Sequence, residues 1–239
     1  MPNWVYNGLT IEGNPSEIND LVAQLNKPFK MVHDSWNMEN GQMQKKLTTY
    51  PNPVFAFYNI YNYIEDGVTD YEYLAQPDHS LPIEESMKFA TNDWYNWNVR
   101  NWGTKWDVAV SSDDKYPDTY TEGPTSNGEN LVVYYNFNTA WSPPFPAIAK
   151  LSGQYPTLLF TLSYEEEQGW GGEMEILRGE IISNSEYGWK CRECDAELEE
   201  VPYCEECDYD TCPECGYGEP DEKCQTHSVQ SESKGKAEV

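Results

Sequence analysis

The sequence predicts an α+β protein with helices on one face of a mostly antiparallel sheet. Its 239 residues have room for one medium domain plus an appendage, or for two small domains. Aromatic residues make up 14% of the chain, with 18 tyrosines and 9 tryptophans, so a core can form although the hydrophobic fraction is 38%. The expected elements follow the order β-α-β and then α-β-β-α-β-β-β, which is typical of this class.

The chain begins with an expected strand at Trp4–Glu12, followed by a clear helix start. Asn14 is a favourable N-cap, Pro15 fits the first helical position, and Glu17 has the place of a capping-box carboxylate. Apolar residues then recur on one helical face, and we expect Pro28 to end the helix.

The next segments have weaker patterns. Lys30–Pro53 is polar without a firm period, and we interpret it as an extended insertion. Val54–Tyr58 is a short apolar run and is expected to be a strand. Tyr61–Gln76 is rich in tyrosine and acidic residues, which predicts a loop with fragments of regular structure.

Four of the nine tryptophans lie in the stretch Asp93–Asp107. We expect a helix over Ile83–Trp102 that ends at Gly103, a residue free to take the positive φ of a helix C-cap. Asp93 falls on the narrow polar side of this helix, and a broad apolar arc contains Met87, Ala90, Trp94, Tyr95, Trp97, Val99 and Trp102. Such an arc predicts a core helix; the alternative is a face on which a ligand stacks.

The alternative interpretation defines a possible ligand face. Arg100 and Lys105 are the cations near the tryptophans, and they either hold an anion or pair with Asp93 and Asp107. The residues of this possible ligand face are Trp94, Trp97, Arg100, Trp102, Lys105, Trp106 and Trp141.

After the tryptophan stretch we expect a strand at Trp106–Ser111, a loop at Ser112–Asn130 and a strand at Leu131–Asn138. Ser142 then resembles an N-cap, before a helix that runs to Gly153. The remaining expected elements are a strand at Thr157–Tyr164 and a hairpin of Glu173–Leu177 with Glu180–Ser183, turning at Arg178-Gly179.

Three motifs carry a family resemblance: NGLTIEG at Asn7–Gly13, NWGTKWD at Asn101–Asp107 and TAWSPP at Thr139–Pro144. With them, residues from about Trp4 to Glu186 resemble the YubB ferredoxin-like domain family, which is found on bacteriophages and conjugative plasmids. The resemblance implies a ferredoxin-like α/β plait without an iron–sulfur cluster. It implies no catalytic residues, and fold alone does not give function.

All seven cysteines lie between Cys191 and Cys224, where the composition of the chain changes. They form pairs of ligands with two intervening residues, and a histidine completes the last pair: Cys191, Cys194, Cys204, Cys207, Cys212, Cys215, Cys224 and His227. Eight such ligands suit two tetrahedral Zn²⁺ sites, which are structural because no coordination position stays open.

Two layouts fit the ligand spacing. In the sequential, ribbon-like layout, which we favour, the first four ligands hold one ion and the last four hold the other. In the cross-brace layout, the first and third pairs share an ion. The sequence thus predicts three parts: residues 1–187 as the ferredoxin-like domain, 188–228 as the zinc module and 229–239 as a disordered tail.

The formal net charge of −26 disfavours nucleic acid and anionic membranes as partners, and it favours a basic partner or simply solubility. The cysteine-rich tail also contains more acidic than basic residues, unlike zinc ribbons that bind nucleic acid. No apolar run approaches the roughly 20 residues of a membrane span, and the start lacks the features of a signal peptide. We therefore expect a location in the cytoplasm of a host cell.

Four functions remain open on the sequence. The first is a non-enzymatic phage or plasmid accessory protein that binds a host protein in host takeover or defence evasion. The others are an acidic DNA-mimic inhibitor of a host nuclease, a nucleic-acid-binding protein, and an enzyme with a site around Arg100 and Lys105.

Overall fold

A computed structural model describes residues 3–37, 41–74, 93–111 and 118–190, together with the pairs 197–198, 203–204 and 209–210. The chain divides into two compact units. The first unit is Met1–Glu167 with Gly172–Ser185, and the second is Gln168–Gly171 with Glu186–Val239.

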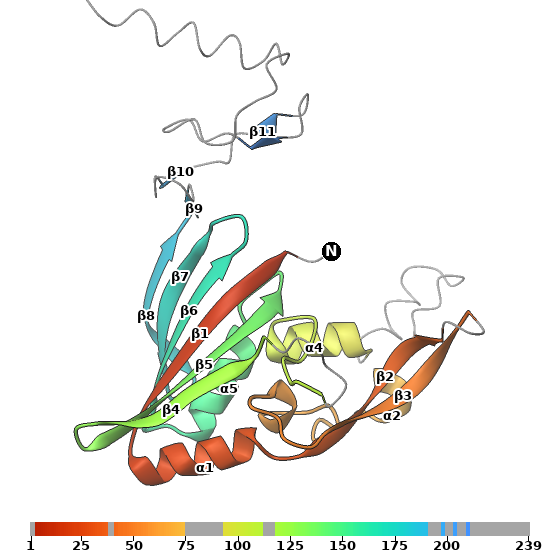
Figure 1. Cartoon of the computed structure of the whole chain (residues 1–239), viewed down its shortest axis with the longest axis horizontal. Coiled ribbons are helices and arrows are strands. Elements are labelled where there is room, and N and C mark those ends of the chain that lie inside the picture. Colours follow the sequence, from red (N-terminus) through yellow and green to blue (C-terminus); the bar gives the residue numbers. More distant parts are fainter. Residues whose placement is uncertain are drawn as a thin grey trace, which may run out of the picture. The chain divides into compact units, whose positions relative to one another are not determined.

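A six-stranded antiparallel sheet forms the body of the first unit (Figure 1). Its spatial order is β4-β5-β1-β6-β7-β8. The strands are β1 (Trp4–Gly13), β4 (Tyr120–Asn127), β5 (Asn130–Ala140), β6 (Leu159–Glu166), β7 (Gly171–Leu177) and β8 (Glu180–Tyr187). The plait consists of the four strands β4, β5, β1 and β6 in this order. In it β5 lies between β1 and β4, which is the split βαβ arrangement of ferredoxin-like folds. The predicted α+β class and ferredoxin-like topology are therefore confirmed.

Strand β1 lies at the centre and pairs on both edges. It pairs with β5 from Trp4 to Gly13 and with β6 from Val5 to Glu12. Successive side chains of a strand point to opposite faces, so alternate residues of β1 share the inner face. Val5, Asn7, Leu9 and Ile11 are these residues, and each is 0% exposed.

Two helices of the plait, α1 (Pro15–Leu25) and α5 (Phe145–Gln154), cover the inner face of the sheet. The α1 start is confirmed, because the Asn14 side chain accepts the Ser16 N–H and Pro15 occupies the first turn. Glu17 instead accepts a hydrogen bond from the Thr157 hydroxyl. In α5 the predicted N-cap moves from Ser142 to Pro144, because Ser142 Oγ donates to the Gly103 carbonyl oxygen.

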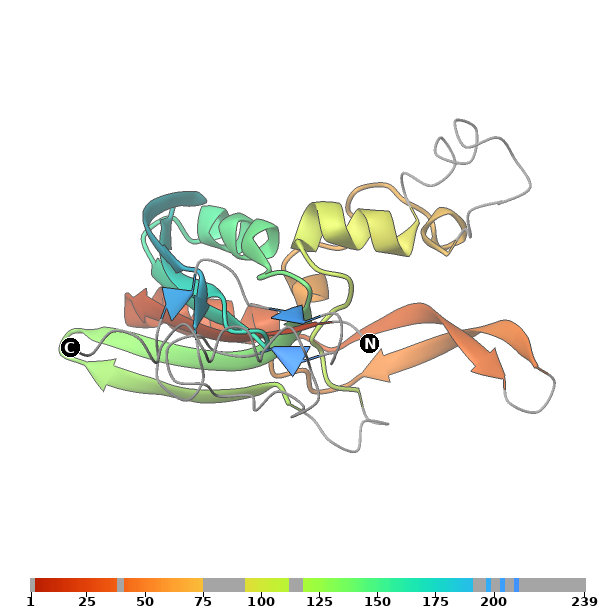
Figure 2. The ribbon, with the colours of Figure 1, turned by 90° about the horizontal axis from the view of Figure 1, so that it is seen from above.

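The tryptophan-rich helix is an insertion and not one of the two plait helices. It is α4 (Trp94–Trp102), which lies beside α5 on the same side of the sheet (Figure 2). It belongs to a long insertion between α1 and β4. The other described elements of this insertion are β2 (Phe29–Asn37), β3 (Gln42–Tyr50), the 3₁₀ helix η1 (Phe57–Asn59) and α2 (Asp70–Tyr73).

Strands β2 and β3 form a separate two-stranded hairpin within the segment that we predicted as an irregular extended insertion. The Phe29 ring stacks between Tyr50 and Tyr58, with centroid distances of 4.5 and 4.3 Å. These stacks fix the base of the hairpin to the body. The sequence pattern did not reveal the hairpin because most of its exposed residues are polar and its two strands pair only with each other.

Three element predictions are wrong. Val54–Tyr58 is not a strand but a bend leading into η1, and Trp106–Ser111 has no regular structure. The predicted loop Ser112–Asn130 contains β4, whose turn-like composition is compatible with an edge strand that pairs only with β5. Tertiary pairing overrides local propensity in each of these segments.

The predicted helix Ile83–Trp102 starts later in the structure. Asp93 has extended backbone (φ −62°, ψ 155°), and its carboxylate caps α4 by accepting the Tyr95 and Asn96 N–H groups. The predicted C-cap at Gly103 is confirmed by its φ of 82°. The start of the predicted helix, with Met87 and Ala90, lies outside the described residues.

The second unit contains two short strand pairs within its described residues. Strand β9 (Trp189–Lys190) pairs with β10 (Glu197–Leu198), and β11 (Tyr203–Cys204) pairs with β12 (Tyr209–Asp210). Across the described part of both units, no helix has the length and apolar character needed to cross a membrane.

We predict that Gly103→Ala lowers the free energy of unfolding by roughly 2–4 kcal/mol, from backbone strain and overpacking. A Cβ at this position would collide with the Pro146 ring, and φ is +82°. Gly128→Ala is the matched control, because φ is also positive (+66°) but nothing lies within 4 Å of the added atom. Chemical denaturation followed by tryptophan fluorescence measures both losses, and equal losses would contradict the packing argument.

Candidate functional site: the aromatic cluster around Lys105 and the open sheet face

Four aromatic rings surround the ammonium group of Lys105; we call these five residues the Lys105 cluster. Lys105 Nζ lies 4.5 Å from the ring centroid of Trp106, 4.9 Å from Trp141, 5.7 Å from Trp94 and 5.9 Å from Tyr95. Among the described residues, Lys105 makes these cation–π contacts and no ion pair with a carboxylate. The environment of the Lys105 ammonium is therefore aromatic, although the chain has 41 acidic residues against 15 basic ones.

Trp141 reaches the cluster through a strained backbone. Its φ is +70°, a conformation that bulky side chains rarely adopt, and its N–H donates to the Asn3 carbonyl oxygen at 2.9 Å. The side chain is 43% exposed, close to the 39% of Trp106 and the 38% of Tyr95. The fold therefore holds three large aromatic side chains partly in solvent beside one cation.

Two tryptophans of the predicted ligand face are not at the surface. Trp97 and Trp102 are both 0% exposed, and their rings pack edge to face at 5.4 Å. Trp102 Nε1 donates to the Tyr61 carbonyl oxygen. The predicted arc was also too broad, since Tyr95 and Val99 are exposed. One side of the helix therefore lies in the core, as the core-helix interpretation predicts. The other side contributes Trp94 and Tyr95 to the Lys105 cluster.

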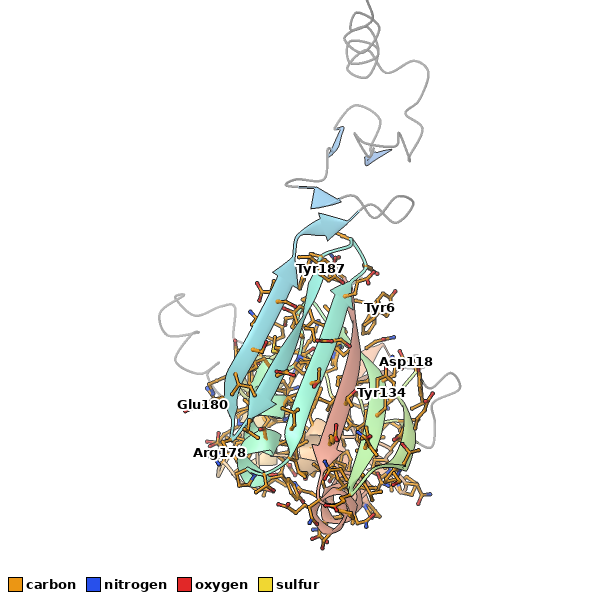
Figure 3. The ribbon with its side chains drawn as sticks, turned by 90° about the vertical axis from the view of Figure 1, so that its left-hand side faces the viewer. Tyr6, Asp118, Tyr134, Arg178, Glu180 and Tyr187 are labelled. Atoms are coloured by element: carbon orange, nitrogen blue, oxygen red, sulfur yellow. The ribbon has the colours of Figure 1, made fainter. Side chains whose placement is uncertain are left out.

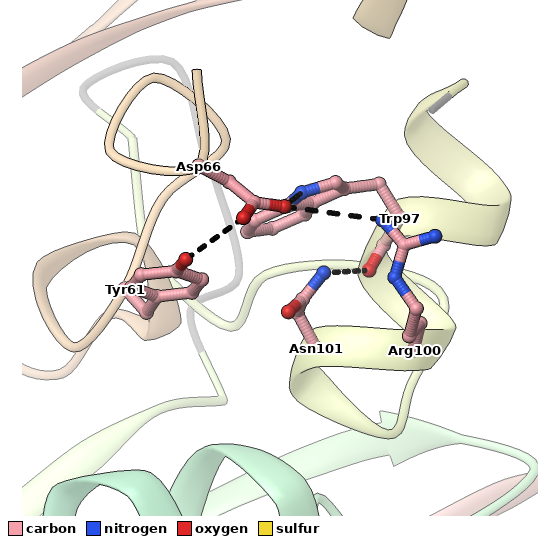
Figure 4. Close-up of polar contacts among 5 residues, drawn as sticks. All are labelled: Tyr61, Asp66, Trp97, Arg100 and Asn101. Atoms are coloured by element: carbon pink, nitrogen blue, oxygen red, sulfur yellow. Dashed lines mark hydrogen bonds and ion pairs between the residues drawn. The ribbon is translucent and has the colours of Figure 1, made fainter. Parts of the chain in front are cut away.

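Arg100 lies apart from the cluster, on the side of α4 that faces Asp66 (Figure 4). Its guanidinium is 3.9 Å from Asp66 Oδ2, which also accepts the Trp97 indole N–H at 2.9 Å. The Tyr61 hydroxyl donates to Asp66 Oδ1 at 3.0 Å. The hydrogen bond from Trp97, then that from Tyr61, lowers the pKa of the Asp66 carboxyl below its ordinary value of 3.8.

Asp107 does not pair with Lys105 but binds backbone amides. Its Oδ1 accepts the N–H groups of Phe57, Val108 and Ala109, and its Oδ2 accepts that of Tyr58. Burial raises the pKa of this carboxyl, and the four N–H groups oppose that rise. The carboxylate therefore fixes the start of η1 to the segment after the tryptophan stretch.

A cavity of about 430 Å³ adjoins the Lys105 cluster. Trp94 and Trp106 belong to both, and Asp107 and Asn98 contribute polar groups to the cavity wall. The Asn98 amide is satisfied, since it accepts from the Tyr73 hydroxyl at 2.8 Å and donates to the Lys105 carbonyl oxygen at 2.9 Å. The β2–β3 hairpin also lines the cavity, with Met31, Val32, His33 and Tyr50.

The second candidate surface is the sheet face that the plait helices leave open (Figure 3). Tyr6 and Tyr134 lie on it, and the register places Glu165 beside Tyr6 and Glu122 beside Tyr134. Gly8 makes room for the Tyr134 side chain, because a Cβ there would come within 2.8 Å of the Tyr134 hydroxyl oxygen. The outward residues of the other strands add Glu12, Glu173 and Glu175.

The open sheet face is strongly one-sided in charge. None of the six strands, all of which the structure describes, contains a lysine or an arginine. Arg178 lies in the turn between β7 and β8, at the margin of the face (Figure 3). A surface of carboxylates and tyrosines without cations attracts a basic partner and repels phosphate backbones.

The predicted zinc ligands fall almost entirely outside the described residues. Only the backbone of Cys204 is described, as part of β11. Within the described part of the chain, no group of three or more His, Cys, Asp or Glu side chains gathers as a metal site. The zinc sites therefore stay a prediction, and the same holds for the disordered tail at 229–239, which also lies outside the described residues.

Sequence reasoning missed Tyr95 as a member of the Lys105 cluster and missed the open sheet face. The absence of lysine and arginine from every strand was visible in the sequence. The sequence did not show that this absence creates a cation-free surface, because the strand bounds and the side of the sheet covered by helices come from the tertiary structure.

The family comparison agrees with the ferredoxin-like fold. Residues 105–207 match a family model described as "Ferredoxin-like domain in Api92-like protein". The match begins at Lys105 and extends to Cys207, which is less than half of the chain. A crystal structure of a protein api92 from Yersinia pseudotuberculosis is similar over 80% of this chain and 100% of that one, with 9% identity and a TM-score of 0.41. No curated protein matches the sequence.

We predict that Asp66→Ala lowers the free energy of unfolding at neutral pH by about 1 kcal/mol, because the Trp97 indole N–H loses its acceptor. We expect no more than this because the Asp66 side chain is 37% exposed, so solvent weakens its interactions. The pKa is lowered by folding, so this stabilisation is complete above the ordinary value of 3.8 and is lost as pH falls through the lower, folded value.

The measurement compares denaturant unfolding of the two proteins from pH 7 to pH 3. Asp20→Ala, an exposed aspartate on α1, is the control for loss of one negative charge. A difference between wild type and Asp66→Ala that stays constant with pH would contradict the role of the carboxylate charge.

Proposed function

We propose that this chain is a non-enzymatic interaction protein that binds a basic protein partner through the open sheet face. One observation carries the proposal: six complete strands without a lysine or arginine present tyrosines and glutamates on a face that no plait helix covers. Aromatic residues dominate binding energy at protein interfaces, and complementary charge sets the association rate and the choice of partner.

The resemblance to YubB proteins of bacteriophages and conjugative plasmids gives this proposal a biological setting. In that setting the partner is a host protein, and binding serves host takeover or defence evasion. The chain acts in the cytoplasm of the host cell, where its clustered cysteines stay reduced and hold zinc.

A DNA-mimic inhibitor is the second candidate, and the same face supports it. Its glutamates sit on a rigid sheet that keeps their spacing fixed, as phosphates are fixed on a duplex. In this case the partner is a nuclease whose basic site also binds DNA. The two candidates differ in one outcome, because only the second predicts that duplex DNA displaces this protein from its partner.

We predict that Glu173→Lys weakens partner binding at least tenfold, because it places a cation inside an otherwise acidic face. Asp20→Lys is the matched control: it makes the same change in charge at an exposed position on α1 and is expected to leave binding within about twofold. The measurement is capture from host lysate with each immobilised variant, followed by affinity titration of the captured protein at several salt concentrations.

Binding that is lost equally in both variants would show only a net-charge effect and would remove the assignment to this face. Affinity that does not fall with increasing salt would count against an electrostatic interface. Competition by duplex DNA would select the DNA-mimic candidate.

The zinc module is the second part of the proposal. The cysteine-rich segment has little apolar sequence, so metal would supply the folding energy of the module, on the order of 10–16 kcal/mol per site in zinc-finger peptides. Cys191, Cys194, Cys204, Cys207, Cys212, Cys215, Cys224 and His227 would hold two ions. The module would then extend the interaction surface of the chain.

We predict that EDTA makes residues 188–228 sensitive to protease while residues 4–186 stay resistant, because the plait has its own core. Elemental analysis of fresh, untagged protein is expected to find two zinc ions per chain. His227→Ala should release one of them, whereas Ser228→Ala should release none. Protein that contains no zinc, or a tail whose digestion EDTA does not change, would end the zinc proposal.

A further inference from the structure

Strand β8 forms one edge of the six-stranded sheet, and β7 is its neighbour among the described strands (Figure 3). The part of β8 that belongs to the first unit is Glu180–Ser185, which we call the β8 edge, and every residue of it is exposed. Such an edge presents a row of backbone N–H and C=O groups with which a further strand can pair. Edge strands of natural proteins usually carry devices that prevent this pairing.

The opposite edge of the sheet carries such devices, whereas the β8 edge does not. Strand β4 contains Pro124, which has no N–H to donate, and its register with β5 shifts between Glu122 and Thr125. The β8 edge contains neither a proline nor a lysine. It is therefore open to an added strand, which is how several peptide-binding domains recognise an extended peptide.

The turn before β8 determines which backbone groups point outward. Arg178 and Gly179 form a two-residue turn in which both φ angles are positive, so Glu180 is the first residue of β8 that pairs with β7. Alternate residues of an antiparallel strand direct their N–H and C=O groups to the same neighbour. Those of Glu180 point to β7, and those of Ile181 and Ser183 point outward. The β8 edge thus offers both donors and acceptors to an added strand.

The side chains of the β8 edge leave apolar surface on both faces of the sheet. The same turn places Ile181 opposite buried Ile176 on the inner face, and Ile182 opposite Glu175 on the open sheet face. Ile181 is 44% exposed and Ile182 is 55% exposed. Side chains of an added strand would cover both, because cross-strand neighbours on one face contact each other.

The charges beside the β8 edge favour a basic segment. Residues 173–185, all of which the structure describes, contain three glutamates and one cation, Arg178. Glu180 lies on the β8 edge itself, and Glu173 and Glu175 point to the open sheet face from β7. Arg178 attracts an acidic group at the turn, but the carboxylates outnumber it along the strands. Complementary charge therefore selects lysine and arginine on the open-face side of an added strand.

A second copy of this chain fits the β8 edge less well. Pairing of β8 with β8 would bring the glutamates of two copies to one sheet face, and like charges on neighbouring strands are destabilising. Each copy also carries a formal net charge of −26, so the two would repel each other. A basic segment meets neither penalty.

We propose that the basic partner presents an extended segment that pairs with the β8 edge as a seventh strand of the sheet. Lysines or arginines at alternate positions lie beside the glutamates, and their aliphatic stems cover Ile182. Apolar residues between them cover Ile181 on the inner face. The inference rests on the proposed function, because the same glutamates attract the partner, and it adds the form in which the partner binds.

A synthetic peptide tests this pairing directly. The probe is an acetylated and amidated heptapeptide in which lysines and valines alternate, and it is titrated into the isotope-labelled full chain at low salt. We expect saturable binding with a Kd of about 1 mM or lower. The amides of Ile181 and Ser183 should exchange hydrogen more slowly in the complex, whereas the amide of Ser126 on β4 should exchange at an unchanged rate.

Two control peptides separate strand pairing from charge attraction. The first has the same composition with all lysines before all valines, so it keeps the charge but not the alternation. The second replaces each lysine with glutamate and reverses the charge. Each should bind at least tenfold more weakly than the probe.

Matched proline variants test the backbone groups. Ser183→Pro removes an N–H that points outward from the β8 edge and should weaken probe binding at least tenfold. Ser126→Pro makes the same change on β4, next to Asn127, which pairs with Asn130 across a two-residue turn, so its N–H also points outward. It should leave the affinity within about twofold. The exchange measurement on the wild-type chain decides the question even where Ser183→Pro does not fold.

The captured host partner separates this inference from the proposed function. Loss of its binding in Ser183→Pro but not in Ser126→Pro supports pairing with the β8 edge. A partner that binds weakly to Glu173→Lys and normally to Ser183→Pro would leave the proposed function standing and would overturn the inference.

Four results with the peptides would also overturn it. These are no saturable binding of the probe, unchanged exchange of Ile181 and Ser183, equal binding of the block-order peptide, and equal loss of affinity in the two proline variants. Dimerisation of the chain without peptide, with the same amides protected, would instead assign the β8 edge to a second copy.

Discussion

The structure depends on β1, the central strand that pairs along its whole length with β5 and along nearly all of it with β6. Its four inward side chains are fully buried, because α1 and α5 cover the inner face of the sheet. One of the four, Asn7, is polar, and its amide donates to the Phe137 carbonyl and the Thr139 hydroxyl oxygens of β5. These bonds fix the register of the two strands as well as their contact, because a slip of one residue would turn every side chain to the other face.

The long insertion between α1 and β4 gives this plait its particular surfaces. Buried Trp97 and Trp102 attach α4 to the body, and the Asp107 carboxylate holds the backbone of η1 through its amides. With those contacts in place, the other side of α4 presents Trp94 and Tyr95 to Lys105. A helix with aromatic residues on more than one side thus builds part of the core and part of an exposed aromatic cluster at once.

The open sheet face and the cavity beside the Lys105 cluster differ in chemical character. The open sheet face has carboxylates without cations, so its attraction for a basic partner acts over a distance and depends on salt. The cavity of about 430 Å³ is instead lined by the rings of Tyr50, Tyr73, Trp94 and Trp106, and Asp107 contributes a carboxylate to its wall.

The sequence alone determined the local features: the Asn14-Pro15 helix start, the Gly103 cap and the Arg178-Gly179 turn, where both residues have positive φ. Such features depend on side-chain and backbone chemistry within a few residues, so local sequence specifies them. Only the tertiary structure decided that β4, with its turn-like composition, is a strand. It also decided that Trp97 is buried in the core whereas Trp94, on the same helix, contacts Lys105. Those outcomes depend on partners far away in the chain, because pairing with β5 and packing against the insertion outweigh the local preferences of the residues.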